Sequence, residues 1–472
     1  MEPLTYRNLR KQIVSVIRSM HARGFRRNDR IAVMSPPGPE TAVAIVAIMA
    51  GFTAVPLDIR YKEADLADLF ARIGIRAVVV LKGHITPAIR AAAAGRIPVL
   101  EMVPSATAGQ FTIFPEMPEE KGAVEFATAT DTAYILLTSG TTGDAKIILR
   151  GQAEAAFGKI RTCGLQKISA TDRCLHMIPY HHGIGISASL LVPLTGGATV
   201  ICPRDFIPHD FARLLMTARP TVSTATPALC WELLRALRKV PRDQLKDNPL
   251  RYIRVSSGVL PGDLQTSLEE ILGAPLIDSY GMSESGLVAI NVPPRKGSVG
   301  IPVSGSLAIM DDRGVPLPPG ERGEIWIKDR ELFHGYAGRE QNNAAEFTDG
   351  WFRTGDIGYL DADGYLFLSG RKKELINKGG EKVSPAEIDT ALKMHPGVRD
   401  AMAFGVPDPV LGEEIAALVV VANNGVTEQE LRHFLLDRMV HFKVPRKIIF
   451  TDAIPKNPMG KPLRAEGTKR YS

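Results

Sequence analysis

The chain has 472 residues, of which 45% are hydrophobic and 23% are charged, and these ordinary fractions exclude the disordered and fibrous classes. Its formal net charge of +6 is mild for this length and gives no indication of a nucleic-acid partner. A chain of this size exceeds one hydrophobic core, so two or three domains are expected.

The first half of the chain alternates predicted helices and strands. Apolar positions at helical spacing predict a helix from Asn8 to Arg23, which Gly24 ends. Alternation of this kind is typical of parallel βαβ units and predicts a doubly wound α/β layer. The further segments predicted are strands at 30–34, 54–57, 77–81, 198–202 and 221–225, and helices at 40–51 and 66–73.

One long segment contains no Asp, Glu, Lys or Arg, from Cys174 to Pro203. Interior prolines, several glycines and three histidines interrupt it, so it lacks the unbroken apolar run of about 20 residues that a membrane-spanning helix needs. We expect buried strands around a pocket wall here, and no stable membrane insertion.

The pattern changes after Val292. Closely spaced turn signals predict a small β-rich subdomain over about 293–370. A basic segment begins at Gly370, and about a hundred residues of mixed α and β character follow it. We therefore predict two domains, 1–370 and 371–472.

The four cysteines, Cys163, Cys174, Cys202 and Cys230, show neither a CxxC pair nor a metal-ligand spacing. For a chain of this size, free thiols in a reducing compartment are the expected reading. The first residues show no basic-then-apolar signal pattern. A cytoplasmic location is expected.

An apolar strand beginning at Tyr134 runs directly into a segment of hydroxyl residues, glycines and a lysine, which ends at Lys146. The glycines let backbone N–H groups approach an anion, and the hydroxyls and the lysine add donors around it. The segment differs from a Walker A loop, which would need Gly at position 145. It predicts a phosphate-binding loop, and the alternative is a surface turn rich in Ser and Thr.

Three later segments are weaker signals when taken alone. Asp278–Glu284 offers an aromatic side chain for a base and a carboxylate for a hard cation. Trp351–Asp356 offers a carboxylate for ribose hydroxyls, and Pro455–Lys461 offers a lysine on a loop. The alternative interpretation of the first segment is an ordinary strand followed by a turn, and that of the second is a turn. The alternative for the third is a solvated surface lysine.

In combination and in this order, the segments resemble the adenylate-forming superfamily of acyl-CoA synthetases, peptide-synthetase adenylation domains and firefly luciferase, and they look most like acyl-CoA ligases. The resemblance covers nearly the whole chain. The matching motifs are 137–146, 179–182, 280–284, 351–356, 370–385 and the loop of Lys461.

The resemblance implies an α/β fold with a large N-terminal adenylating domain and a small mobile α+β C-terminal domain. It implies an acid–thiol ligase that forms an acyl-adenylate and pyrophosphate from ATP and a carboxylic acid. The thiol of coenzyme A then displaces AMP. ATP, Mg²⁺ and coenzyme A are the implied cofactors and co-substrates. The oligomeric state is expected to be a monomer or a homodimer.

The resemblance also assigns residues to roles. The catalytic set is Lys461, Glu284, Ser283 and His182, with Glu284 and Thr138 at the metal. The nucleotide site comprises Thr138, Ser139, Gly140, Thr141, Thr142, Gly143, Lys146, Ser279, Tyr280, Gly281 and Met282, with Asp356 and Arg371 on the ribose. The acid pocket comprises His181, His182, Gly183, Ser256, Ser257, Gly258 and Val259.

The same resemblance places a hinge at Lys373, about which the C-terminal domain rotates between the half-reactions. The run Gly379-Gly380-Glu381 would then line the thiol tunnel. Two alternatives to a CoA ligase stay open: a stand-alone adenylating enzyme that loads the phosphopantetheine of a carrier protein, and a catalytically silent scaffold. Retention of the motif residues argues against the silent scaffold.

Overall fold

The computed structural model describes residues 2–116, 123–138, 146–303, 305–338, 340–422, 425–456 and 462–471, without the side chains of 340–342. The chain forms two compact units. Unit 1 comprises Met1–Ser257, Thr266–Val288 and Asp329–Ala345, and unit 2 comprises Gly258–Gln265, Ala289–Lys328 and Glu346–Ser472.

The first sheet of unit 1 has seven strands in the order β5-β4-β3-β1-β2-β6-β7. Its inner strands pair in parallel, and the edge strands β5 and β7 pair antiparallel to their neighbours. The strands are β1 (Arg30–Val33), β2 (Thr53–Pro56), β3 (Ile75–Leu81), β4 (Val99–Pro104), β5 (Phe111–Phe114), β6 (Thr132–Thr138) and β7 (Lys146–Gly151). The helices between and around them are α1 (Tyr6–Ala22), α2 (Pro39–Gly51), α3 (Glu63–Ile73), α4 (Pro87–Ala94) and α5 (Gln152–Gln166).

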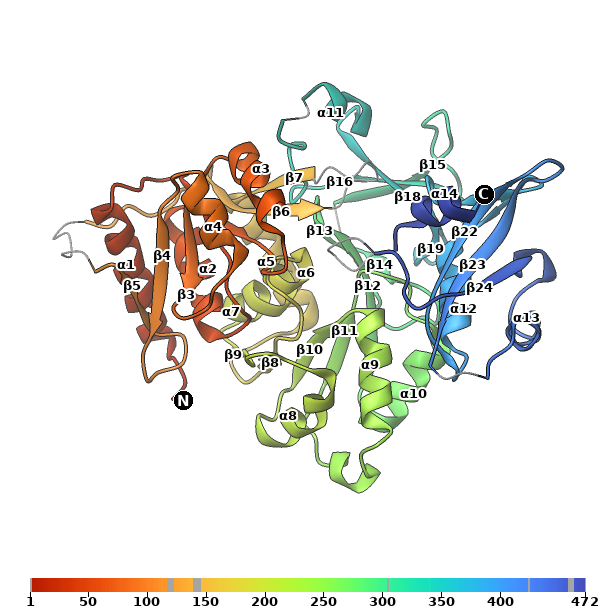
Figure 1. Ribbon diagram of the computed structural model, residues 1–472, viewed down its shortest axis with the longest axis horizontal. Coiled ribbons are helices and arrows are strands. Elements are labelled where there is room, and N and C mark those ends of the chain that lie inside the picture. Colours follow the sequence, from red (N-terminus) through yellow and green to blue (C-terminus); the bar gives the residue numbers. More distant parts are fainter. Residues whose placement is uncertain are drawn as a thin grey trace. The chain divides into compact units, whose positions relative to one another are not determined.

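Helices cover this sheet on both faces, as the red and orange elements of Figure 1 show. Val78 and Val80 of β3 pack in one core with Leu66, Leu69 and Phe70 of α3. Because successive strand residues point to opposite faces, the buried residues between them face the other side, where α1 and α2 pack together. The doubly wound α/β layer predicted from the sequence is confirmed.

The second sheet of unit 1 pairs five parallel strands in the order β9-β8-β10-β11-β12, followed by β13. The strands are β8 (Arg173–Leu175), β9 (Thr199–Ile201), β10 (Val222–Ala225), β11 (Tyr252–Val255), β12 (Leu276–Met282) and β13 (Gly286–Ile290). The helical segments around them are α6 (Gly183–Ile186), η1 (Ser187–Leu191), α7 (Val192–Thr195), η2 (Pro208–Asp210), α8 (Phe211–Thr217), α9 (Pro227–Leu237), η3 (Arg242–Leu245) and α10 (Gly262–Leu272).

The expectation of buried strands throughout 174–203 is wrong. Only the short strands β8 and β9 lie at its two ends, and 183–195 is helical, with a π-helical turn at η1. A helix that is apolar all round is buried. Pro193, one of the prolines that interrupt the apolar run, lies in the first turn of α7, directly after the π-helical turn. Such a turn breaks the regular hydrogen-bond ladder.

Unit 2 contains the predicted β-rich segment, except for Asp329–Ala345, and the C-terminal segment. The third sheet has the order β15-β16-β18-β17, with β19 paired to β18. Its strands are β15 (Ser306–Met310), β16 (Gly323–Lys328), β17 (Phe347–Thr348), β18 (Trp351–Leu360) and β19 (Leu366–Arg371). Strand β14 (Ile301–Pro302) comes before them and pairs with β13, and helix α11 (Glu340–Glu346) lies between β16 and β17 in the chain.

The fourth sheet has the order β21-β20-β23-β22, with β24 on β23. Ala401 and Ala403 of β22 face a core with α12 and α13, while Met402 and Phe404 face α14. The C-terminal segment is therefore an α+β layer with its own core. Its elements are β20 (Ile376–Lys378), β21 (Glu381–Val383), α12 (Pro385–Lys393), β22 (Val398–Asp408), β23 (Gly412–Val421), α13 (Glu428–Leu436), η4 (His441–Lys443), β24 (Lys447–Phe450) and α14 (Arg464–Tyr471).

The described part of the chain contains no helix that is both long and apolar enough to cross a membrane.

Candidate active site

The two strands that flank the predicted phosphate loop form an antiparallel pair. Thr138 ends β6 and Lys146 begins β7, and the register of the two strands places these residues opposite each other. Both are partly buried. The loop positions Ser139, Gly140, Thr141, Thr142 and Gly143 lie outside the described residues, as does Lys461.

A tyrosine that the sequence analysis missed joins two of the predicted site residues. The hydroxyl of Tyr336 donates to Oε1 of Glu284 at 2.7 Å, and Nζ of Lys146 lies 4.0 Å from the centre of the Tyr336 ring. Glu284 and Tyr336 are both buried. Tyr336 is held beside β7 by a bridge to Ile148. The predicted phosphate-binding lysine and the predicted metal-binding carboxylate therefore share one aromatic partner.

The backbone of Glu284 is fixed by a second missed residue. Nη1 of Arg150 donates to the Glu284 carbonyl at 2.7 Å, and the backbone N–H of Phe333 donates to the same oxygen at 2.8 Å. Arg150 is 2% exposed, so water does not compete strongly for these bonds. The loop that carries Glu284 is held to β7 by a buried guanidinium.

The other side of Arg150 meets a buried ionic cluster. Its Nη2 lies 3.1 Å from Oε1 of Glu331, which also accepts from Lys159 Nζ at 2.8 Å. Arg161 pairs with the second oxygen of Glu331 at 3.1 Å. Glu331 is fully closed to solvent, so its charge depends on these three partners. Removing one partner of a buried ion pair typically costs about 3–5 kcal/mol.

The two adjacent histidines of the predicted acid pocket lie with ring centres 4.2 Å apart. Nε2 of His181 is 3.4 Å from Oδ2 of Asp58, without the alignment of a hydrogen bond. Burial lowers the pKa of His181 to about 4, which keeps the ring neutral near neutral pH. Burial alone would raise the pKa of Asp58, but hydrogen bonds from Arg60 outweigh it and lower that pKa.

The next residue of this segment lies beside the predicted α-phosphate contact. A Cβ added at Gly183 would lie 3.3 Å from Oγ of Ser283 and 3.2 Å from a methyl group of Leu136. The fold thus brings Gly183, which follows the two histidines, next to Ser283 and to strand β6. These segments are about a hundred residues apart in the chain.

Two strand ends supply the remaining pocket positions. Ser256, directly after β11, donates from Oγ to the carbonyl of Ser279 at 3.1 Å. Oγ of Ser279 donates to the carbonyl of Val255 at 2.8 Å and accepts from Nε of Arg254 at 2.9 Å. Ser257 has a φ of 71°, a strained value for a residue with a side chain.

The exposure of the other predicted residues varies. Ser257, Gly258 and Val259 are exposed, whereas Tyr280 is buried. Gly281 and Met282 are partly buried, and a Cβ at Gly281 would come within 2.5 Å of the Gly286 carbonyl, so position 281 requires glycine.

In unit 2, the two predicted ribose contacts form an ion pair across neighbouring strands. Asp356 of β18 and Arg371 of β19 are in register, with Oδ1 and Nε 3.1 Å apart. Asp356 is buried and Arg371 is half-exposed. The backbone N–H of Asp356 donates to Oγ1 of Thr354 at 3.0 Å, which fixes the turn of this bulged strand.

The predicted hinge residue Lys373 is exposed, and its two neighbours are tied to different sheets. Lys372 Nζ pairs with Asp312 at 2.8 Å, in the turn after β15. Glu374 pairs at 3.2 Å with Arg464, whose Nη2 lies 2.7 Å from Asp389 of α12. Within unit 2, position 373 is thus a junction between the third and fourth sheets.

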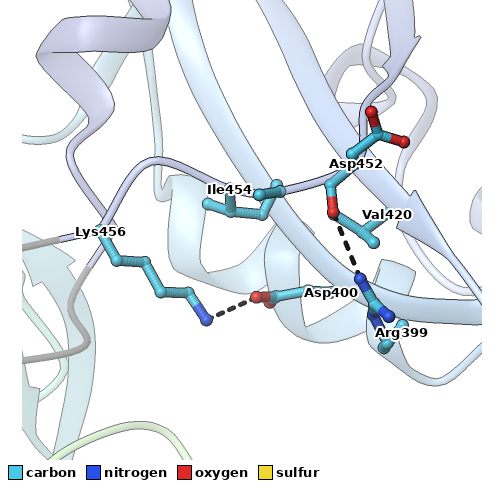
Figure 2. A pocket seen from close by; sticks show the side chains of 7 residues that line it. Arg399, Asp400, Val420, Asp452, Ile454 and Lys456 are labelled. Atoms are coloured by element: carbon cyan, nitrogen blue, oxygen red, sulfur yellow. Dashed lines mark hydrogen bonds and ion pairs between the residues drawn. The ribbon is translucent and has the colours of Figure 1, made fainter.

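The segment before Lys461 borders a small cavity of about 190 Å³, shown in Figure 2. Nζ of Lys456 points at Asp400, 2.5 Å away, and Nη2 of Arg399 donates to the Asp452 carbonyl at 3.2 Å. Lys456 also bridges Pro462. Both cations of this cavity, Lys456 and Arg399, therefore already have partners. The contacts of Lys456 hold the chain in place just before the predicted Lys461 loop.

Comparison with known proteins identifies the family of this chain. A family model for AMP-binding enzymes matches residues 2–337, and a model for the C-terminal domain of AMP-binding enzymes matches residues 387–461. The chain therefore belongs to the family of AMP-binding enzymes, and the resemblance stated from its motifs is confirmed.

Two curated relatives are 32% identical to this chain. They are the oxalate–CoA ligase of Arabidopsis thaliana, with 93% of this chain and 87% of the relative aligned, and the sulfoacetate–CoA ligase of Cupriavidus necator, with 98% and 91%. The crystal structure of ATP-bound MatB from Rhodopseudomonas palustris matches with a TM-score of 0.85 and 27% identity, over 100% of this chain and 95% of that one. The predicted acid–thiol ligase class, with a large N-terminal and a smaller C-terminal domain, is confirmed.

Proposed function

We propose that this protein is an AMP-forming CoA ligase whose first half-reaction is carried by the contact of Lys146, Tyr336 and Glu284. Oxygen of the acid carboxylate attacks the α-phosphorus of ATP, and the bond to the β-phosphate oxygen breaks to release pyrophosphate. The sulfur of CoA then attacks the acyl carbonyl carbon, the thiol proton is lost, and AMP leaves.

The first step brings two anions together, so its catalysis rests on charge neutralisation and alignment. Lys146 supplies a cation at the end of the predicted phosphate loop. Its place over the Tyr336 ring holds that cation beside Glu284. We assign Thr138, Lys146 and the loop between them to the β- and γ-phosphates, with Ser283 at the α-phosphate.

Glu284 suits a magnesium ion that is bound mainly by ATP. Tyr336 donates to its Oε1, and within the described part of the chain Oε2 has no hydrogen-bond partner. The described residues include no cluster of three or more His, Cys, Asp or Glu that could hold a metal. Mg²⁺ is usually held by one or two carboxylates together with substrate phosphates, where it neutralises charge.

The second half-reaction is assigned to a rotation of the C-terminal domain about Lys373. The ion pairs of Lys372 and Glu374 support this assignment, because they anchor the chain to different sheets on either side of a single residue. Gly379 and Gly380 have φ of 60° and 92°, which suits a close approach of backbone to the pantetheine arm. Lys461 is assigned to the first half-reaction, and the domains are taken as 1–370 and 371–472.

The rest of the proposal concerns the cellular location, the thiol acceptor and the oligomeric state. All four cysteines are free thiols, and burial raises the pKa of Cys174 to about 12, of Cys202 to about 11 and of Cys230 to about 12. Free thiols support a cytoplasmic location. We propose CoA as the acceptor because the relatives named above are CoA ligases. A monomer or homodimer stays the expected state.

The test is ATP–pyrophosphate exchange over a panel of carboxylic acids, followed by acyl-CoA formation detected by mass. A suitable acid should give exchange, and CoA should release AMP and yield the thioester. Glu284→Gln should lose exchange, whereas Glu63→Gln, in an exposed surface pair, should keep it. Adenylate that persists with CoA but discharges onto a phosphopantetheinylated carrier protein would favour the carrier alternative. No exchange with any acid would contradict the proposal.

A further inference from the structure

We propose that Arg254 binds a second anionic group of the acid substrate, at the end distant from the carboxylate that is activated. The substrate class is then a short acid with a further carboxylate or sulfonate. This inference rests on the proposed function and specifies which acids the pocket takes.

Arg254 is a buried cation that has no anionic partner among the described residues. It is 5% exposed, and among the residues that the structure describes no carboxylate lies within ion-pair distance of it. Its one hydrogen bond there runs from Nε to Oγ of Ser279, at 2.9 Å. A guanidinium carries five N–H donors, so its two Nη groups remain to be satisfied. The set of polar atoms that are both shielded from solvent and without a hydrogen-bond partner does not include either Nη atom.

The neighbouring carboxylates are committed elsewhere. Asp278 precedes Ser279 and points to the opposite face of β12, where burial raises its pKa to about 7. Glu331 acts on Arg254 only at longer range, because its two oxygens pair with Arg150, Lys159 and Arg161. Burial lowers the pKa of Arg254 to about 10, so it is still a cation at neutral pH.

The position of Arg254 is where a ligand is expected. It is one residue from the carboxyl end of β11, and its register partner is Ile277 of β12. The carboxyl ends of parallel strands are where open α/β sheets bind ligands. Its contact Ser279 and the residue two positions on, Ser256, are both among the predicted pocket positions. The guanidinium therefore contacts one predicted pocket position, Ser279, and lies on the same face of β11 as another, Ser256.

The buried guanidinium of Arg254 favours an anionic ligand. Burying a charged group without a partner is costly, and a substrate anion would remove that cost by accepting from the Nη groups. Arginine forms bidentate pairs with carboxylates, and a sulfonate offers a similar set of acceptor oxygens. A neutral acid with an aliphatic tail would leave the charge unpaired. Arg254 thus discriminates by the second anionic group and not by chain length.

The experiment compares acids that differ only by a methyl group in place of the second carboxylate: oxalate with acetate, malonate with propanoate, succinate with butanoate, and glutarate with pentanoate. The readout is the ratio of kcat/KM for pyrophosphate exchange within each pair, which does not depend on how much enzyme is folded. For at least one pair, the wild type should prefer the dianion by about 100-fold or more, since a buried polar group left unpaired discriminates strongly.

Arg254→Met should abolish that preference by slowing the dianion and sparing the matched monoanion, and Arg254→Lys should retain part of it. Arg173→Met is the control, because the side chain of this exposed arginine, at the opposite end of the same sheet, donates among the described residues only to a backbone carbonyl. Equal slowing of both acids by Arg254→Met, or a wild type that activates monoanions without preference, would overturn this inference alone. A wild type that activates no acid would overturn the proposed function together with it.

Discussion

Arg150 and Glu331 form an ion pair of 3.1 Å in which both side chains are closed to solvent. The pair connects strand β7, which follows the predicted phosphate loop, to the segment that carries Tyr336. Through its other Nη, Arg150 holds the carbonyl of Glu284. One buried arginine thereby links three segments of the proposed adenylation site.

Glu331→Gln should destabilise the protein strongly, because it leaves Arg150, Lys159 and Arg161 without their shared anion. The expected loss in the free energy of unfolding is about 3–5 kcal/mol, measured by urea denaturation. Glu63→Gln breaks the exposed pair with Arg90 and should cost less than about 1 kcal/mol. Similar losses in both variants would mean that the cluster does not stabilise the fold.

Tyr336→Phe removes the hydroxyl that donates to Glu284 while keeping the ring under Lys146. A hydrogen bond to a charged group contributes about 1.5–3 kcal/mol, so adenylation should slow by roughly 10- to 100-fold. Pyrophosphate exchange over a range of Mg²⁺ concentrations measures this. Tyr336→Leu, which removes the ring as well, should be slower still. Unchanged exchange in the Phe variant would show that the hydroxyl does not position the carboxylate.

Lys461→Ala should impair adenylation and leave thioester formation from supplied acyl-adenylate largely intact. Losing one donor that stabilises developing charge typically costs about 10²–10³ in rate. Separate assays of the two half-reactions measure the effect. Lys456→Ala, which removes the anchor to Asp400 at the base of the loop, should have a smaller effect in the same direction. Exchange by Lys461→Ala at the wild-type rate would refute the assigned role.

Lys373→Pro fixes φ near −65° at the proposed pivot. The variant should form adenylate but fail to transfer it to CoA. Lys373→Ala keeps the rotation and should perform both half-reactions. If the proline variant slowed both half-reactions equally, the pivot would lie at another residue.

Asp278→Asn should change how stability depends on pH. The pKa of Asp278 is raised by burial to about 7 in the folded protein, so the folded state holds a proton that the unfolded state has lost above about pH 4. This carboxyl therefore makes the protein less stable as pH rises from about 4 to 7. Burial lowers the pKa values of His176 and His181 to about 4. These histidines act in the opposite sense, because as pH falls the unfolded state binds their protons before the folded state does.

The slope of unfolding free energy against pH between about 4 and 7 should accordingly be more positive in Asp278→Asn than in the wild type, by about 1.4 kcal/mol per pH unit. Urea denaturation at several pH values measures it. A uniform loss of stability at every pH would change the intercept and leave the slope unaffected. Parallel slopes in the two proteins would show that Asp278 titrates normally.

Local pattern indicated part of the candidate site, and the roles of those residues stay predictions. The strand before the phosphate loop, Lys146 at the start of the next strand, and the run that ends in Glu284 are all visible as spacing along the chain. Tyr336, Arg150 and Glu331 were not found, because their roles depend on contacts between positions 52 to 181 residues apart. The signal that was available was a charged residue within an otherwise apolar strand, as at Arg150 and Arg254.

The helix at 183–195 was not predicted from the sequence, because local rules favoured another structure there. Buried strands were expected in this segment, yet it is a largely buried helix with a π-helical turn directly before Pro193. Local breaker rules weigh single residues, whereas the buried apolar surface of the whole segment decides its structure.

The state of the protein's own thiols has a consequence for its chemistry. An acyl-adenylate is a mixed anhydride, and any accessible thiolate would accept its acyl group as readily as a cognate thiol does. Thiolate, not thiol, is the nucleophile. Burial raises the pKa of Cys174, Cys202 and Cys230 to about 11 or 12, and it also raises the pKa of Cys163. All four sulfurs therefore stay protonated near neutral pH. The protein's own thiols are thus poor nucleophiles toward the intermediate near neutral pH.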